Sequence, residues 1–537
     1  MRTGLSKDLI ARVLGQAPKW TVAELEEKFP PRNLSEGAIV TRFAPSPTGF
    51  FHTGNLYPAI VDKKLAQQSG GIFILRIEDT DTMREVPGAV DIVVNSLAKF
   101  GLTPDEGAVG EGKEIGDYGP YTQSMRKDIY QSVAAELLAC GAAYPCFLAA
   151  EEMDEIRTKQ TAAGFRTGIY GEWAKWRDAG EDEITAQLDA GQVPSIRLYS
   201  TGDFNRKVYC KEAVRGSVES PENDNDIVII KSNDGLPTYH FAHLVDDHFM
   251  RITHVFRDQT YTPSLALHVQ MFNMMGWALP VYIHHATIDT LDAETGGRRK
   301  LSKRKDREAG VGNLLEDGWA PEAILEYIFN IIASGYEEAK MKNPALTVWD
   351  YPINIKKLPA SGALFDMKKL EWWARELIAA MDESKYEITE RVMAWAAEYS
   401  PEWYARIKDK REYLHRVLDI ERDNPKRIRK DFVTWKQTLE EVAYFWDDEF
   451  VVACRARPGA CDAPLQEFLN SYDSKDSKDL WWEKIVAIAE KLGVKNGDVA
   501  MCLRVALTGR TNAPDLYSVM QVMGEERVWE RIKACLK

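Results

Sequence analysis

The sequence lacks the cysteine patterns that mark disulfide scaffolds and zinc sites. Its seven cysteines are odd in number and widely scattered, and none forms a Cys-x-x-Cys pair. Neither a disulfide framework nor a zinc knuckle is therefore expected. No apolar run approaches the length of a membrane span, and the acidic residues among the first 27 argue against a transit peptide. These absences favour a protein of the reducing cytoplasm with no membrane partner.

The chain also has no excess of positive charge. It carries 68 lysines and arginines against 82 acidic residues, for a net charge of −14. A nucleic-acid partner is not excluded, because contact with a phosphate backbone needs a local basic surface rather than a basic total. Basic residues do gather at 298–307 and at 426–430. With 537 residues, the chain is too long for one hydrophobic core and should divide into several domains.

The N-terminal third predicts a βαβ unit. Residues 1–36 indicate a helical prefix, and 38–44 indicate a buried strand. A loop with two prolines and two glycines follows, after which Asn55 is a suitable N-cap for a helix over 56–69. Residues 72–77 (IFILRI) resume as a strand. Strand, loop, helix and strand in this order predict an α/β fold with a doubly wound, Rossmann-type parallel sheet.

The rest of the chain divides by composition. The segment from about 111 to 224 has mixed charge and many turn residues, which is typical of an insertion, and the apolar strand 227–231 should return to the sheet. From about 320 onward the sequence is almost entirely helical in pattern. The predicted domains are therefore a helical extension over 1–36, a catalytic domain over 37–110 and 225–335, an α/β insertion over 111–224, a connecting region over 336–385, and an all-α region over 386–537.

Two short segments carry phosphate chemistry. The first, 42–55 (RFAPSPTGFFHTGN), places Gly54 and Asn55 at a helix start, where free N–H groups attract an anion. His52 can donate a hydrogen bond to an oxygen that gains charge in a transition state. An isolated His-x-Gly-Asn is more often an ordinary turn. The second segment, 300–304 (KLSKR), is a basic loop after a Gly-Gly pair, suited to close over a triphosphate. No phosphate loop of the GxxxxGK[ST] type occurs.

The two segments resemble the HIGH and KMSKS signatures of class I aminoacyl-tRNA synthetases, and RFAPSPTG narrows the resemblance to the glutamyl and glutaminyl branch. The match to bacterial glutamyl-tRNA synthetases extends over most of the chain. It includes RIEDTD (76–81), GPYTQS (119–124), LPTYHFA (236–242), VDDH (245–248), GALFD (362–366) and LRVALTGRTNAPDLY (503–517). The helical C-terminal region separates the chain from glutaminyl relatives, whose anticodon-binding part is a β-barrel.

The resemblance implies roles for the motif residues. His52, Lys303 and Lys300 would be catalytic, and Gly54, Asn55, Ser302 and Arg304 would bind ATP. Guanidinium groups pair bidentately with carboxylates. Arg42, helped by Tyr239, would thus bind the side-chain carboxylate of glutamate, and Arg257 its α-carboxylate. Glu78 with Ser46 would bind the ammonium. Glu78 as a turn cap and Tyr239 as a core aromatic are the structural alternatives.

The resemblance also implies the reaction and the partners. The enzyme would use ATP with Mg²⁺ to convert L-glutamate to glutamyl-adenylate, with tRNA(Glu) bound first. It would then transfer the glutamyl group to the 2′-hydroxyl of the terminal adenosine, acting as a monomer. The insertion over 111–224 would hold the acceptor end, the region over 336–385 would contact the tRNA stem, and the helical region over 386–537 would bind the anticodon. Arg427, Arg429 and Trp435 are candidates for tRNA contact, although an exposed helix face with one packed tryptophan also explains them. A glutaminyl-tRNA synthetase, a tRNA-independent nucleotidyltransferase of the same fold and a catalytically silent RNA-binding homologue are the competing hypotheses.

Three positions depart from the family pattern. Residues 258–261 read Asp-Gln-Thr-Tyr, where relatives show Gly-Glu-Glu-Trp or close variants. His243 stands where relatives often have Asn or Val. Cys146 is followed by Phe-Leu, and 164–172 holds neither cysteine nor histidine. Because a lone thiol cannot make a tetrahedral site, no structural zinc is expected.

Overall fold

The chain folds into two compact units. The computed structural model describes residues 3–49, 51–81, 86–292, 294–302, 305–423, 428–450 and 461–536. The first unit comprises Met1–Gly312 and Ile328–Phe365, and the second comprises Asn313–Tyr327 and Asp366–Lys537. Over these described stretches, no helix is both long and apolar enough to cross a membrane.

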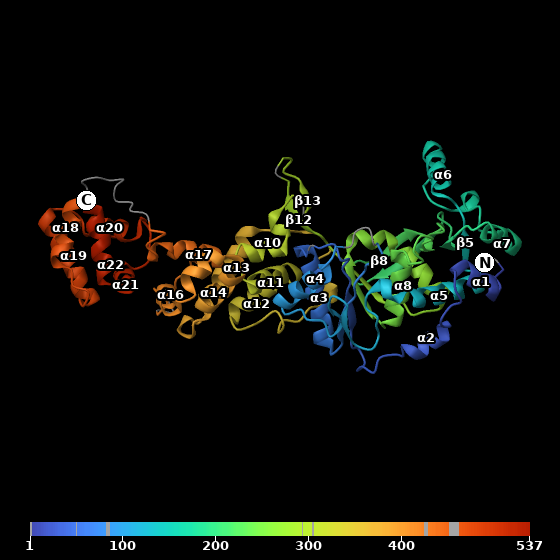
Figure 1. Ribbon diagram of the computed structural model, residues 1–537, viewed down its shortest axis with the longest axis horizontal. Coiled ribbons are helices and arrows are strands. Elements are labelled where there is room, and N and C mark those ends of the chain that lie inside the picture. Colours follow the sequence, from blue (N-terminus) through green and yellow to red (C-terminus); the bar gives the residue numbers. More distant parts are fainter. Residues whose placement is uncertain are drawn as a thin grey trace. The chain divides into compact units, whose positions relative to one another are not determined.

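Among the described residues, every strand and about half of the helices lie in the first unit (Figure 1). Its strands are β1 (Val40–Phe43), β2 (Ile72–Leu75), β3 (Glu106–Gly110), β4 (Lys113–Ile115), β5 (Ala143–Cys146), β6 (Ser195–Leu198), β7 (Lys207–Glu212), β8 (Gly216–Pro221), β9 (Val228–Ile230), β10 (His254–Asp258), β11 (Val281–His285), β12 (Ile288–Leu291), β13 (Arg298–Lys300) and β14 (Ala363–Leu364). Its helices are α1 (Lys7–Leu14), α2 (Val22–Lys28), α3 (Thr53–Ser69), α4 (Ala89–Lys99), α5 (Lys127–Ala139), α6 (Ala150–Ala162), α7 (Glu181–Asp189), α8 (Tyr239–Phe249), α9 (Leu265–Met275) and α12 (Tyr336–Lys342).

Parallel strands form the centre of the first unit. β1 pairs with β2 and β2 with β3, both in parallel, and β10 pairs with β11 in parallel. The two groups meet where the N–H of Thr253, just before β10, donates to the C=O of Val40 at 3.0 Å. β1 is buried along its whole length, as a strand covered on both faces should be. The predicted parallel α/β fold is confirmed.

Helix α3 begins three residues earlier than predicted. Its N-cap is His52 rather than Asn55, so the prediction of an Asn55 cap is wrong. Asn55 instead lies in the first turn, where its side-chain oxygen accepts from the N–H of His52 at 3.3 Å. Asn55 therefore caps the helix from its first turn by accepting from the backbone N–H of His52, and His52 itself is the N-cap residue.

The strand at 228–230 does not return to the parallel sheet. β9 pairs with β6 in antiparallel fashion, and β6 pairs with β5, which gives a separate three-stranded sheet. The prediction for 227–231 is therefore wrong. Its apolar side chains are buried in the core that β5, β6, α5 and α8 share, and burial on both faces looks the same in sequence for either sheet.

The helical prefix belongs to this same core. Leu9, Ile10 and Val13 of α1 are buried in it, and α1 lies against α5 and α7 (Figure 1). Beyond α2, the guanidinium of Arg32 forms two hydrogen bonds to Glu106, at 2.7 and 2.9 Å. The prefix therefore contacts both β3 and the core around α5, and it contains the helices α1 and α2.

The second unit is helical. The chain passes between the units within α10 (Val311–Glu316) and α11 (Pro321–Ile332). The other helices of the second unit are α13 (Met367–Ala380), α14 (Glu387–Tyr399), α15 (Pro401–Ile407), α16 (Arg411–Leu418), α17 (Trp435–Val442), α18 (Asp462–Ser471), α19 (Lys478–Leu492), α20 (Asn496–Thr508), α21 (Leu516–Met523) and α22 (Glu525–Leu536). Helices α18 to α22 pack against one another as one cluster (Figure 1).

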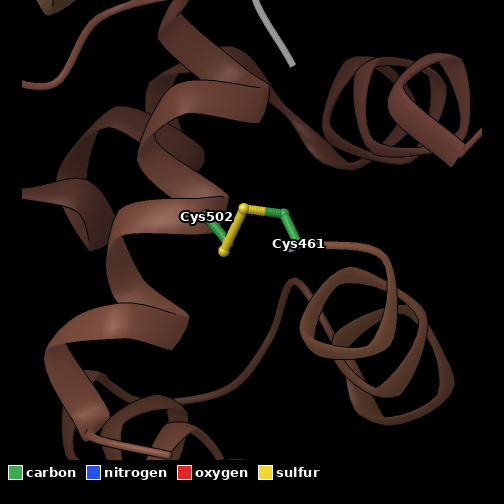
Figure 2. Close-up of a disulfide and its surroundings, with 2 residues drawn as sticks. All are labelled: Cys461 and Cys502. Carbon is green, nitrogen blue, oxygen red and sulfur yellow. A yellow bond between two sulfur atoms is a disulfide. The ribbon is translucent and has the colours of Figure 1, made fainter. Parts of the chain in front are cut away.

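A disulfide joins two of these helices, contrary to the sequence-based expectation. Cys461, the N-cap of α18, is bonded to Cys502 of α20 (Figure 2). Their Cα atoms are 5.3 Å apart, within the usual range for a disulfide. The two cysteines are 41 residues apart in sequence, and only the packing of α18 on α20 brings them together.

Candidate active site

A cavity of about 370 Å³ opens at the carboxyl ends of the parallel strands. Ligands gather at this edge in open α/β sheets, because loops there diverge and helices begin there. The predicted residues that line the cavity are Arg42, Ser46, His52, Gly54, Asn55, Glu78, Tyr239, Arg257 and Lys300. Side chains from segments more than 250 residues apart in the sequence thus face one space, as the motifs predict.

His52 and Gly54 shape the phosphate end of this cavity. His52 is extended at the start of the 17-residue helix α3, whose first N–H groups and dipole favour an anion. A Cβ added to Gly54 would lie 2.8 Å from both Cε1 and Nδ1 of the His52 ring. Glycine is therefore required at 54 if the imidazole is to lie over the helix start. This arrangement fits a polyphosphate.

The structure joins the first phosphate motif to the segment that follows the basic loop. The N–H of Val311 donates to the C=O of Phe51 at 3.2 Å, and His52 forms an isolated bridge with Gly310. Between them, Asp306 holds the basic loop by accepting from Arg299 at 2.6 Å on each carboxylate oxygen. The chain that leaves the basic loop is therefore held beside the start of α3.

The basic loop itself contacts the altered segment. The ammonium of Lys300 donates to the carboxylate of Asp258 at 2.8 Å, and the N–H of Ser302 donates to Asp306 at 2.8 Å. Lys303 and Arg304 lie outside the described residues, so their predicted roles stay predictions. Asp258 also caps the short 3₁₀ helix η4 (Gln259–Ser264) by accepting from the N–H of Thr260. The altered segment is thus an ordered wall of the cavity that restrains Lys300.

A buried ion network supports the amino-acid end of the cavity. Asp247 accepts from Arg76 at 2.6 Å and from Nε of Arg42 at 3.3 Å. Arg76 also donates to Glu78 at 3.2 Å. Beyond it, Asp246 accepts from Arg126 at 2.6 Å. Three arginines and three carboxylates balance one another here with little or no solvent contact.

This network sets the charges that a ligand meets. Burial alone would raise the pKa of Asp247, but Arg42 and Arg76 hold that pKa well below the ordinary value. Burial raises the pKa of Glu78, and the two arginines offset part of this rise. A ligand ammonium next to Glu78 would favour its ionised form further. The cavity therefore offers a ligand the carboxylate of Glu78 and, beside it, the guanidinium of Arg42.

Arg257 forms the opposite wall. It is the last residue but one of β10 and is 6% exposed. Its guanidinium lies 4.9 Å from the ring centre of Tyr282 and 5.6 Å from that of Tyr261. Tyr239, at the start of α8, approaches Arg257 at 3.5 Å and packs on Tyr261 with ring centres 5.2 Å apart. Burial raises the pKa of Tyr239 to about 12, so its hydroxyl is neutral and available to a ligand.

Sequence reasoning missed five residues of this site. Arg76 and Asp247 lie within RIEDTD and VDDH, so the motifs held the signal, but it did not show which charges are buried. Asp258 was seen only as a departure from the family. His268 and His284, which accept hydrogen bonds from Arg257 at 3.1 and 3.0 Å, carry no local signal at all.

The predicted tRNA contacts fall in the second unit. Trp435 is only 4% exposed, which agrees with the alternative of a packed tryptophan, and its contact with tRNA stays a prediction. Arg429 is 8% exposed and pairs with Asp431 at 2.6 Å. It nevertheless lines a pocket of about 270 Å³ with Lys430 and Arg510, and its role stays a prediction. Arg427 lies outside the described residues.

The structure bears on metals in one respect. Among the residues that it describes, no three His, Cys, Asp or Glu side chains stand close enough to hold an ion. Cys146 is buried in β5. The absence of zinc stays a prediction. Mg²⁺ usually binds through substrate phosphates and water rather than through an all-protein cage, so this cavity fits Mg²⁺ that enters with a triphosphate.

Two family models match the chain. The model described as tRNA synthetases class I (E and Q), catalytic domain, covers residues 38–372. The model described as anticodon binding domain covers residues 387–536. The second match begins within one residue of the predicted start of the helical region at 386.

Curated and solved relatives agree with these matches. The chain is 42% identical to a glutamate–tRNA ligase of Acetivibrio thermocellus, with 95% of each chain covered. It is 42% identical to one of Clostridium perfringens, over 95% of this chain and 96% of that one. A crystal structure of a glutamate tRNA ligase from Elizabethkingia meningosepticum, in complex with its amino acid, superposes with a TM-score of 0.77 at 28% identity. It covers 93% of this chain and 99% of that chain.

Proposed function

The chain belongs to the glutamate–tRNA ligases of the class I tRNA synthetases, and from that membership we propose how its cavity carries out the reaction. Glutamate and ATP bind side by side in the 370 Å³ cavity. The α-carboxylate attacks the α-phosphorus, pyrophosphate leaves, and glutamyl-adenylate forms. The 2′-hydroxyl of the terminal adenosine of tRNA(Glu) then takes the glutamyl group and releases AMP. The glutaminyl and tRNA-independent alternatives are not favoured, because the relatives are glutamate–tRNA ligases.

The convergence of two arginines and one carboxylate in one cavity carries the proposal. Glutamate has two carboxylates and one ammonium, and the cavity offers Arg42, Arg257 and Glu78. Opposite charges matched in a partly desolvated site select the ligand strongly. Glutamine would leave one guanidinium without an anion.

The two arginines divide between the two carboxylates. The ammonium and the α-carboxylate share one carbon, so both must bind neighbouring protein groups. Glu78, the proposed ammonium site, is electrostatically coupled to Arg42. The hydroxyl of Tyr239, which the resemblance places at the side-chain carboxylate, lies 3.5 Å from Nη1 of Arg257, and this contact favours Arg257 with Tyr239 for the side-chain carboxylate and leaves Arg42 for the α-carboxylate. That is the reverse of the assignment implied by the family resemblance, and Ser46 keeps its predicted place beside the ammonium.

Positioning and charge neutralisation supply the catalysis. Attack on the α-phosphorus places negative charge on oxygens that fixed donors can stabilise. His52 and the start of α3 would stabilise the phosphate end, while Lys300 and Lys303 would neutralise the departing pyrophosphate together with Mg²⁺. Gly54, Asn55, Ser302 and Arg304 would complete the ATP site. Because Lys300 is held by Asp258 in the structure, it has to exchange this partner for phosphate.

Binding of tRNA involves both units in this proposal. The inserted region would hold the acceptor end, and the helical unit would bind the anticodon, with Arg429 as a candidate contact. We also propose that glutamate activation requires bound tRNA and that the enzyme works as a cytoplasmic monomer.

Parallel charging assays test the function. Purified total tRNA is incubated with labelled glutamate or glutamine, ATP and Mg²⁺, using wild type and Lys303→Ala. We expect glutamate charging by the wild type and a loss of about 10² or more in the variant, the usual effect of removing one group that stabilises transition-state charge. Preferential charging with glutamine would refute the substrate assignment. ATP–pyrophosphate exchange at full rate without tRNA would refute the tRNA requirement alone.

A further inference from the structure

Histidines are concentrated around Arg257. Seven of the nine histidines in the chain lie between positions 240 and 285. His268 of α9 and His284 of β11 contact the guanidinium directly, and His240 of α8 contacts His268. His268 and His284 are 1% and 0% exposed. Nothing in the proposed reaction uses these rings, so their arrangement requires another explanation.

The contacts fix the tautomer of each ring. A guanidinium can only donate, so the ring nitrogens that face it must be unprotonated acceptors. Nε of Arg257 donates to Nε2 of His284 at 3.0 Å, and Nη1 donates to Nδ1 of His268 at 3.1 Å. The second nitrogen of His268 therefore carries hydrogen and donates to Nδ1 of His240 at 3.0 Å. The second nitrogen of His284 faces Glu212 at 3.7 Å.

Arg257 lines the cavity with one of its nitrogens still unpaired among the described residues. Nη2 is buried and has no hydrogen-bond partner among the described residues. A buried donor without a partner is costly, so a site of this kind favours an acceptor that completes it. The lone pairs of His268 and His284 are already used by Arg257. At Arg257 the pocket thus offers donors and positive charge, and neither His268 nor His284 has a lone pair left to accept from the N–H₂ of a side-chain amide.

We infer that His268 and His284 are positioning residues, which hold Arg257 as a preformed receptor for the side-chain carboxylate and thereby favour glutamate over glutamine. His240 acts one step further out by fixing the tautomer of His268. The inference rests on the role proposed above for Arg257.

The surroundings keep both acceptors unprotonated at neutral pH. Burial lowers the pKa of His268 well below its ordinary value, and His243, Arg257 and His240 lower it further, against a small opposing effect of Asp247. Burial lowers the pKa of His284 too. Arg257 and Arg215 add to this, while Glu212 opposes it. The tyrosines packed on these rings, Tyr239 and Tyr282, have pKa values raised by burial and remain neutral.

Exchanges between asparagine and glutamine test the inference. The oxygen of Asn lies close to the position of Nδ1 in histidine, and the oxygen of Gln lies close to that of Nε2. We therefore expect His268→Asn and His284→Gln to keep the KM for glutamate within about threefold of wild type. The mismatched His268→Gln and His284→Asn should raise it about tenfold to a hundredfold, the range of a hydrogen bond to a charged group. In the mismatched variants the preference for glutamate over glutamine in kcat/KM should fall, while the KM for ATP stays unchanged.

The opposite preferences at the two positions, Asn at 268 and Gln at 284, distinguish a positioning role from general packing. A structural role alone would make Asn and Gln behave alike at both positions, and this result would overturn the inference. Equal glutamate KM values in all four variants and wild type would do so as well. Arg257→Met is the companion variant. If it leaves the glutamate KM unchanged while wild type charges tRNA with glutamate, the inference is overturned, whereas the proposed charging activity stands. In wild type, kcat/KM for glutamate should show no step near pH 6.5, the ordinary histidine range.

Discussion

Replacing Asp247 by asparagine tests the buried ion network most directly. Asp247 is 1% exposed and accepts from Arg76 at 2.6 Å and from Arg42 at 3.3 Å. The substituted amide would keep the size of aspartate and one acceptor oxygen, but three buried arginines would then face two carboxylates. Removing one partner of a buried ion pair costs about 3–5 kcal/mol, because the remaining charge stays buried without compensation. We expect Asp247→Asn to destabilise the first unit by an amount in this range.

Hydrogen exchange measures this effect locally. Peptides from β2 and α8 should exchange on the order of 10² to 10³ times faster in Asp247→Asn, since each 1.4 kcal/mol changes an opening equilibrium tenfold. Asp189→Asn is the matched control, because Asp189 pairs with Arg12 at the surface, where the two side chains are 64% and 44% exposed. An exposed pair contributes at most about 1 kcal/mol. Equal, small changes in both variants would show that the network does not stabilise the fold.

The pH dependence of this difference has a definite sign. The pKa of Asp247 in the folded state lies well below the ordinary value of 3.8. The ionised carboxylate therefore adds stability at pH values above the unfolded pKa, and this stability is lost as the pH falls through the folded pKa. The gap between wild type and Asp247→Asn should be constant from pH 8 to about 5 and narrow below about pH 4. A gap that widens on acidification would contradict the assigned charge.

Two further variants probe the phosphate end and the helical unit. Gly54→Ala places a Cβ 2.8 Å from the His52 ring and should displace that ring. We expect kcat for charging to fall about tenfold or more, as when one transition-state donor is displaced, while the midpoint of thermal unfolding changes little. An unchanged kcat would show that the position of the ring does not matter for catalysis. Cys502→Ser opens the link to Cys461 across 41 residues, which should lower the stability of the oxidised helical unit by up to about 4 kcal/mol. Urea unfolding with and without reductant measures this loss of stability. If reductant lowers the stability of the wild type no more than that of the variant, the disulfide does not stabilise the unit.

The sequence predicts most of the fold because local patterns are strong where the chain alternates buried strands with helices. Residues 38–44 and 72–77 each contain one buried strand, and the prefix contains two helices, as expected. The strand at 228–230 was assigned to the wrong sheet, since an apolar run records burial but not its partner. The disulfide between Cys461 and Cys502 was missed for a similar reason, because cysteine spacing carries no information about how α18 packs on α20.

The residues of the candidate site also fall into two groups, those that the local sequence predicts and those that depend on contacts between distant segments. Residues inside motifs, such as His52 and Glu78, could be placed because a short segment fixes both their type and their surroundings. His268 and His284 lie in different elements, and their function depends on which atom of Arg257 each ring meets. That relation exists only after α9 and β11 have packed beside β10. In the proposed site, specificity for a carboxylate thus depends partly on neutral residues that orient the charged one, and a search limited to charged motif residues will overlook them.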